Sequence, residues 1–321
     1  MQNVRGNKVM YKTFSACVVL AVVLGGAHKG RTARSPGSRY HGVLTFATPG
    51  NGDPFSPTII QDYDIATGGL AVRFDGIDAS QARTGEVAYI TRLAGGWMAD
   101  HGVVVADARG VPGAPVFVCK QFNWIDNQSC HTPKLSPDHQ RVAYVSRGGW
   151  GKVCKSNYDM YWSDFVDVTD RRGTLLARFE GYYAPEWLPD GRLLMMGSQC
   201  RNAGIHVADQ GLKGLSRIDD DQVVTPAGGP AVSPDGRTLA FIWNNQVWSL
   251  PLTGKPELTK MTGFGKPVSA ATWSPDGRSI AALMFDVSMP VKSIALFQPG
   301  DQSSVEFRNV AAYPYGPISW R

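Results

Sequence analysis

The chain has 321 residues, of which 43% are hydrophobic and 18% are charged, and its formal net charge is +5. These proportions allow a large buried core in one or two domains, and no stripe of Lys and Arg indicates a nucleic-acid partner. The 36 Gly and 21 Pro residues, together with the lack of any long helical period, favour an all-β chain with frequent turns.

The N-terminus differs in composition from the rest of the chain. Lys8 and Lys12 precede an uncharged run at 13–27 that ends in small residues, which is the layout of a secretory signal peptide. The run is shorter than the roughly 20 apolar residues of a membrane span. We therefore expect cleavage after Ala27, and a retained membrane anchor is the alternative. Because the apolar run continues past Cys17, we interpret this residue as part of the signal and not as a lipid-attachment site.

Removal of residues 1–27 would take away three basic residues and no acids. The remaining chain would carry 29 basic and 27 acidic residues, for a net charge of +2. The polar, basic segment at 28–40 is then expected to be a solvated linker, and 41–321 to form the folded domain.

A repeated segment occurs four times from residue 135 onward. The four copies are LSPDHQRVAYVS from Leu135, LPDGRLLMMGS from Leu188, VSPDGRTLAFIW from Val232 and WSPDGRSIAALMF from Trp273. Their prolines lie 52, 45 and 41 residues apart. A period in the forties with one tight turn in each unit is typical of a β-propeller blade of four antiparallel strands.

The chemistry of the repeat explains its shape. Pro sets φ, Asp bonds back to the backbone and Gly supplies a positive φ, so Ser-Pro-Asp-Gly closes a hairpin. The apolar run that follows, such as 238–243, is predicted to be a strand buried on both faces. We therefore interpret the carboxylates of these turns as structural and not catalytic; they belong to Asp138, Asp190, Asp235 and Asp276.

A second pattern gives the number of blades. Six segments, which start at 62, 103, 166, 205, 247 and 294, each read as a strand that ends in a polar turn. The segment at 43–48 reads as the first strand after the linker, and the final residues 318–321 align with a first strand that lacks its turn. We therefore predict a six-bladed propeller that closes by pairing its N- and C-terminal strands, which removes exposed sheet edges.

The SPDG-type repeats behind a signal peptide resemble the TolB-like, or WD40-like, β-propeller family. The resemblance covers nearly all of the chain after the leader, but the 13 residues at 28–40 leave no room for the N-terminal α/β domain of TolB itself. It implies an exported platform for protein interactions, with an envelope protein or peptide as partner. This inference is an analogy of fold.

The longest predicted loops join second to third strands and fall on the side opposite the SPDG turns. They lie at 48–58, 93–101, 147–158 and 197–203. Two of them contain Gly-Gly-Trp, and Trp and Arg are frequent at binding hot spots. We therefore expect Trp97, Trp150 and Arg201 to contact the partner, although the tryptophans are as well explained by packing on neighbouring loops.

Four cysteines remain after the leader, and four cysteines allow three pairings. Cys154 and Cys200 lie in corresponding loops of adjacent blades, while Cys119 and Cys130 flank one link between blades. Because export makes oxidation plausible, we predict the disulfides Cys119–Cys130 and Cys154–Cys200.

The sequence shows few signs of catalysis. It has no G-x-S-x-G motif, no Cys-x-x-Cys motif and no histidine spacing typical of a metal site. Asp219, Asp220 and Asp221 form a weak candidate for a Ca²⁺ site, but a solvated acidic turn explains them better. We predict a protein- or peptide-binding platform without cofactor, nucleic-acid partner or stable membrane insertion. Two alternatives stay open: a hydrolase or lyase with a metal-assisted site in the central channel, and a binder of small ligands or sugars.

Overall fold

The computed structural model describes residues 40–321, with gaps at 50–57, 95–99, 120–128, 152–160, 198–201, 221–228, 264, 285–291 and 311–314. The described residues form 24 β-strands and no helix, so none of them makes a helix able to cross a membrane. The all-β prediction is confirmed.

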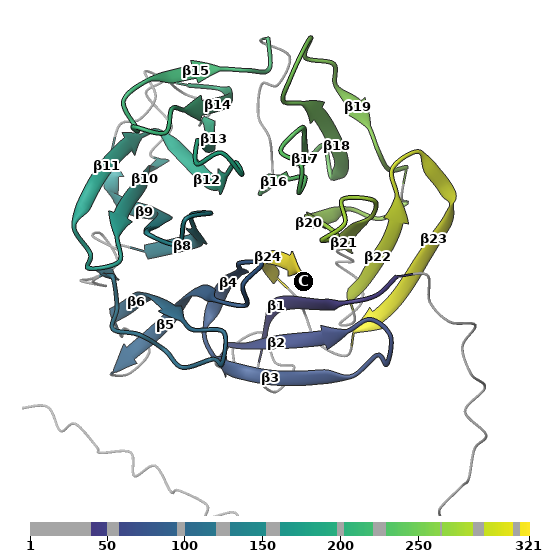
Figure 1. The fold of residues 1–321 in the computed structure, drawn as a ribbon, viewed down its shortest axis with the longest axis horizontal. Helices are drawn as coiled ribbons and strands as arrows, with labels where there is room; N and C mark the ends of the chain where they lie inside the picture. The colour runs from purple at the N-terminus through teal and green to yellow at the C-terminus, as the bar shows by residue number, and fades with distance from the viewer. Residues whose placement is uncertain are drawn as a thin grey trace, which may run out of the picture. The chain divides into compact units, whose positions relative to one another are not determined.

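The strands form six four-stranded antiparallel sheets, arranged as blades around a central axis (Figure 1). We number the blades in chain order and give their strands from the innermost to the outermost. Blade 1 contains β24 (Tyr315–Trp320), β1 (Val43–Pro49), β2 (Thr58–Asp64) and β3 (Leu70–Asp75). Blade 2 contains β4 (Ile77–Gln81), β5 (Val87–Ala94), β6 (Asp100–Ala106) and β7 (Phe117–Cys119). Blade 3 contains β8 (Ser129–Leu135), β9 (Arg141–Gly151), β10 (Tyr161–Asp170) and β11 (Leu175–Glu180).

The other three blades follow the same order. Blade 4 contains β12 (Tyr182–Trp187), β13 (Leu193–Gly197), β14 (Gly204–Ala208) and β15 (Leu215–Arg217). Blade 5 contains β16 (Ala231–Val232), β17 (Thr238–Trp243), β18 (Gln246–Pro251) and β19 (Thr259–Lys260). Blade 6 contains β20 (Val268–Trp273), β21 (Ile280–Met284), β22 (Lys292–Gln298) and β23 (Asp301–Val310).

The second strand of each repeat is largely apolar because it packs against two neighbouring blades. In β13, Leu193 and Met195 belong to the apolar cluster shared with blade 3, whereas Leu194 and Met196 belong to the cluster shared with blade 5. Side chains alternate between the two faces of a strand. A continuous apolar run therefore supplies both clusters, and six such clusters, one between each pair of neighbouring sheets, form the core.

The ring closes where β24 pairs with β1. Leu44 lies opposite Trp320, and the two strands exchange backbone hydrogen bonds between Val43 and Arg321 at 2.9 and 3.0 Å. The predicted closure of the ring by its N- and C-terminal strands is confirmed. Trp320 also packs beside Tyr40, and both side chains are buried.

The SPDG turns are held together by their own side chains. The Ser233 hydroxyl donates to the Asp235 carboxylate at 2.6 Å and accepts from the Thr238 amide at 2.9 Å. The same carboxylate accepts from the Arg237 amide, and Gly236 has a φ of +72°. The serine hydroxyl holds the pKa of Asp235 below its ordinary value, so this acid stays ionised as part of the turn.

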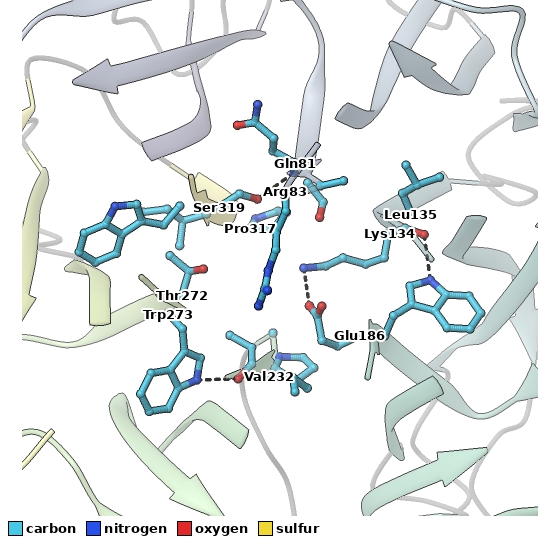
Figure 2. Close-up of a pocket in the computed structure, with 18 of the residues that line it drawn as sticks. Gln81, Arg83, Lys134, Leu135, Glu186, Val232, Thr272, Trp273, Pro317 and Ser319 are labelled. Atoms are coloured by element: carbon cyan, nitrogen blue, oxygen red, sulfur yellow. Dashed lines mark hydrogen bonds and ion pairs between the residues drawn. The ribbon is translucent and has the colours of Figure 1, made fainter. Parts of the chain in front are cut away.

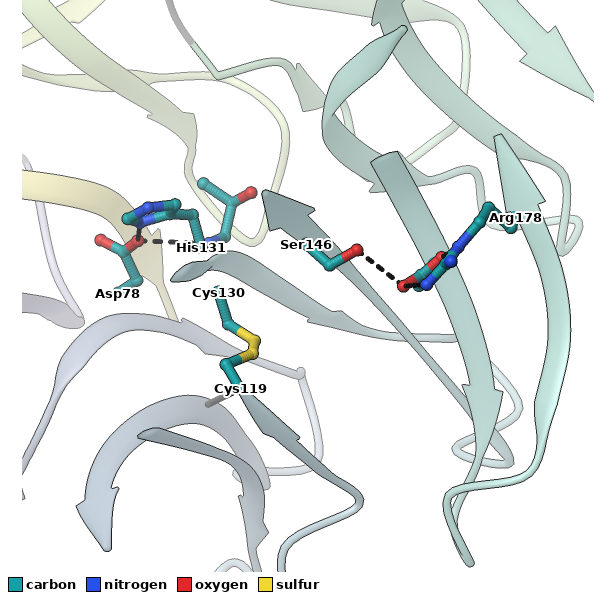
Figure 3. The surroundings of a disulfide bond; sticks show 8 residues. Asp78, Cys119, Cys130, His131, Ser146 and Arg178 are labelled. Carbon is teal, nitrogen blue, oxygen red and sulfur yellow. Dashed lines mark hydrogen bonds and ion pairs between the residues drawn. A yellow bond between two sulfur atoms is a disulfide. The ribbon is translucent and has the colours of Figure 1, made fainter. Parts of the chain in front are cut away.

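Three innermost strands share a bulge that the sequence did not predict. Asp78, Thr132 and Ala184 each lie three residues before the end of their strand, and their φ values are +50°, +47° and +48°. The Asp78 carboxylate accepts from the Thr132 amide at 3.2 Å and contacts the ring of His131 at 3.3 Å (Figure 3). A bulge bends its strand locally. The hydrogen bond between Thr132 and Asp78 also ties blade 2 to blade 3.

A disulfide links the same two blades. Cys119 at the end of β7 is joined to Cys130 in β8, with their Cα atoms 6.0 Å apart (Figure 3). Both residues are buried within the apolar cluster between blades 2 and 3. The predicted Cys119–Cys130 bond is therefore present in the structure.

Candidate functional site

A cavity of about 730 Å³ lies on the central axis of the ring. Residues from the innermost strands of all six blades line it, together with the turns that connect first and second strands (Figure 2). This site lies on the turn side of the propeller, whereas the sequence pointed to the irregular loops on the other side.

The rim of the cavity is apolar and rigid. Four turn prolines border it, namely Pro137, Pro189, Pro234 and Pro275. Behind them lie the tryptophans that end three innermost strands, Trp187, Trp273 and Trp320, whose side chains are buried in the apolar clusters between blades. The indole nitrogens of these tryptophans donate to backbone carbonyls, as with Trp187 to Lys134 at 3.1 Å and Trp273 to Ala231 at 3.0 Å. These buried indoles, each fixed by a hydrogen bond, hold the ends of the innermost strands in place behind the lining of the cavity.

The middle of the cavity carries charge. Lys134 of β8 and Glu186 of β12 form an ion pair, with Nζ and Oε2 2.5 Å apart and with side chains only 13% and 18% exposed. Arg83, in the turn after β4, extends across the opening toward this pair (Figure 2). Gln81 is engaged by the neighbouring blade, because its side-chain oxygen accepts from the Thr45 hydroxyl at 2.8 Å.

The structure describes only some of the residues that the sequence proposed for function. Trp97, Arg201, Cys154, Cys200 and Asp221 lie outside the described residues. Their roles, including the predicted Cys154–Cys200 bond, stay predictions.

The structure places Trp150 in a strand and not in a loop. We expected this residue within a long loop at 147–158, but β9 continues to Gly151, and Trp150 lies opposite Trp162 of β10. The pairing of β9 with β10 extends the hairpin, so the loop is shorter than the sequence suggested.

The acidic triplet contains a structural residue. Asp219 is fully buried, and its carboxylate accepts from Arg217 at 2.6 and 3.0 Å, while Asp220 is exposed with a φ of +48°. Within the described ranges, no three His, Cys, Asp or Glu side chains are grouped closely enough to hold a metal ion.

The charged residues of the cavity were not singled out by the sequence, although the repeat contained a signal for them. Arg83 follows the first strand of a unit whose turn does not match SPDG. Lys134 and Glu186 are each the second-last residue of a first strand that leads into an SPDG-type turn. Aligning all six units by their turns, and asking where a charge replaces an apolar residue, would have found them.

No family model and no curated protein matches the chain. Solved structures do match it. TolB of Acinetobacter baumannii is 19% identical with a TM-score of 0.53, over 81% of this chain and 67% of that one. A candidate TolB of Agrobacterium tumefaciens is 14% identical with a TM-score of 0.52, over 86% and 92% of the two chains. Hydrazine synthase of Kuenenia stuttgartiensis is 13% identical with a TM-score of 0.56, over 87% of this chain and 47% of that one. At such low identities the shared property is the fold. The chain is a six-bladed β-propeller, similar in fold to these TolB structures.

Proposed function

We propose that this chain is an extracytoplasmic binding protein whose central cavity holds an extended segment of a protein of the cell envelope. The observation that carries this proposal is the cavity itself, which is wide, open at the turn side and lined by side chains from all six blades. Its volume lies within the range of ligand sites, about 300–1,000 Å³.

The construction of the rim supports a binding role. The prolines lose little conformational freedom when a ligand docks, and the buried tryptophans behind them keep the strand ends fixed. A preorganised apolar border favours affinity for that reason. An extended segment is the kind of ligand that can enter a central opening while the rest of its protein remains outside the ring.

Two features support a location outside the cytoplasm. The Cys119–Cys130 disulfide joins two buried cysteines, and such bonds persist in oxidising compartments. The charge and apolar pattern of residues 1–27 is that of an export signal. The TolB fold of the chain agrees with this proposal.

The proposal can be tested by filling the cavity. Thr272 lies on β20 and lines the cavity (Figure 2), so Thr272→Trp would place a large side chain in the opening. Leu175 is 51% exposed on β11, the outermost strand of blade 3, so Leu175→Trp adds bulk away from the cavity and serves as the matched control. Each protein would be immobilised and exposed to an envelope extract.

We expect the wild type and Leu175→Trp to retain the same envelope protein and Thr272→Trp to lose it. Retention by all three proteins would contradict a role for the cavity. Loss only in a Trp97→Ala/Trp150→Ala variant would instead place the contact at the irregular loops, as the sequence suggested.

A further inference from the structure

The turn of blade 2 has the same hydrogen bonds as the proline-containing turns. The amide of Ala82 donates to Glu86 at 2.8 Å and that of Gly85 donates to Ala82 at 2.9 Å. In blade 4 the amide of Leu188 donates to Arg192, and that of Gly191 donates to Leu188, both at 2.9 Å. The turns at 82–86 and 188–192 are therefore equivalent, residue by residue.

This equivalence places Arg83 at the position of a proline. In the four SPDG-type turns the residue at this position lines the cavity in each case: Pro137, Pro189, Pro234 and Pro275. Blade 2 puts a long cationic side chain at the same point of the rim, and its guanidinium reaches over the opening (Figure 2).

Arg83 has no hydrogen-bond or ion-pair partner among the described residues. The nearby carboxylates are engaged elsewhere, because Glu186 is paired with Lys134 and Glu86 is bound by His139 and Arg171. The described lining of the cavity contains the cations Arg83, Lys134 and Arg321 and a single side-chain carboxylate. Arg321 is paired with Asp62 at 2.8 Å, and Lys134 is paired with Glu186. Among the described residues of the lining, Arg83 therefore holds the guanidinium that is available to a ligand.

We propose that Arg83 binds a carboxylate of the segment that enters the cavity, so that the partner segment is an acidic peptide. The inference rests on the proposed function of the cavity. A guanidinium offers two parallel N–H donors that match a carboxylate, and such charge-assisted pairs are stronger and more directional than neutral hydrogen bonds. The apolar rim binds the rest of the segment, and Arg83 selects a segment with Asp or Glu at the opening.

The test uses a phage-displayed library of random twelve-residue peptides, selected on the purified full-length protein. We expect the selected peptides to share an Asp or Glu beside apolar residues. The affinity of synthetic, fluorescently labelled copies would be compared with that of matched peptides in which the acid is replaced by its amide.

Arg83→Gln should weaken binding of the acidic peptides by about 10- to 100-fold, the effect of losing one charge-assisted bond. It should leave the binding of the amide peptides unchanged. Arg83→Lys keeps the charge but not the two parallel N–H donors, so it should give an intermediate loss of affinity. Arg83→Pro gives the turn the residue found in blades 3 to 6, and this variant should fold normally while losing the preference for acid.

The outcomes separate the two proposals. If the peptides lose affinity for Thr272→Trp but bind Arg83→Gln as well as they bind the wild type, the cavity is the site and the role of Arg83 is refuted. If Thr272→Trp binds the peptides as the wild type does, or if no peptide is selected, the proposed function fails and the role of Arg83 fails with it.

Discussion

The imidazole of His139 lies 2.5 Å from the carboxylate of Glu86, across the boundary between blades 3 and 2. His139 holds this position with a φ of +61°, at the point where the other SPDG-type turns have glycine. A side chain in the left-handed region costs of order 1 kcal/mol, and such strain persists only where the surroundings enforce it. The contact with Glu86 is the compensating interaction in this turn.

Two substitutions of His139 should separate the cost of its strained backbone from the contribution of its contact with Glu86 to stability. His139→Ala loses the contact and keeps the strained backbone, so we expect its free energy of unfolding to fall by about 2 kcal/mol. His139→Gly loses the same contact but relieves the strain, and its loss should be smaller by about 1 kcal/mol. Urea unfolding of the two variants measures the difference. Equal stabilities would show that the positive φ is not strained.

Two glycines with similar φ values allow a test of packing between turns. Gly236 has a φ of +72°, and a Cβ there would lie 3.2 Å from the Pro189 ring of the preceding blade. Gly254 has a φ of +83° with no atom within 4 Å of such a Cβ. We expect Gly254→Ala to cost about 1 kcal/mol and Gly236→Ala about 1 kcal/mol more. If thermal unfolding gives the same loss for both, the turns of blades 4 and 5 are not packed as described.

Removal of the Cys119–Cys130 disulfide should destabilise the propeller. Both residues are buried, so the Cys119→Ala/Cys130→Ala variant avoids adding buried polar atoms. The bond closes a short loop, and we expect a loss of about 2–3 kcal/mol in unfolding free energy under non-reducing conditions. Peptide mapping without reduction would check the pairing in the wild type and would also test the predicted Cys154–Cys200 bond. Free thiols at 119 and 130 would refute the first pairing.

The stability of the fold should depend on pH through His206. Burial lowers the pKa of this imidazole, which donates to the Asn202 carbonyl at 3.0 Å and packs edge-on against Tyr182. The unfolded chain then binds a proton more readily than the folded one. Stability is thus complete above the unfolded pKa of about 6.5 and falls as the pH drops from there toward the lower pKa of the folded state.

His206→Gln removes this titration, and stability measured from pH 7 to pH 5 should fall less steeply than in the wild type. Burial also lowers the pKa of His101, so a second substitution, His101→Gln, should flatten the profile further. An unchanged slope in both variants would mean that other groups control the acid sensitivity.

Most of the architecture follows from local patterns. The SPDG-type turn recurs in blades 3 to 6. The apolar run recurs because every second strand contacts two neighbouring blades. The bulges at Asp78, Thr132 and Ala184 were missed, since a positive φ at Thr or Ala contradicts intrinsic preference and is imposed by the tertiary structure. The prolines that follow two of them, Pro133 and Pro185, were the available signal.

The cavity was harder to predict than the fold. Lys134 and Glu186 lie in different repeats, and only the pairing of neighbouring blades around the axis brings their charges together. Arg83 looked like an ordinary turn residue, because its unit lacks the SPDG sequence that would have aligned it with the rim prolines. Charged residues that meet across the ring lie far apart in the sequence and leave no local sequence pattern. The strands of each blade, in contrast, have a recognisable local pattern.

The pairing of β1 with β24 joins the first and last strands of the propeller, so blade 1 is complete only when both are present. β1 is among the first strands made, but its inner neighbour includes Trp320, near the last residue of the sequence. Until β24 pairs with it, one edge of β1 has unpaired backbone groups that another chain could join. A chain truncated just before Tyr315 would therefore have five complete blades and an unpaired edge on β1 that is prone to aggregation.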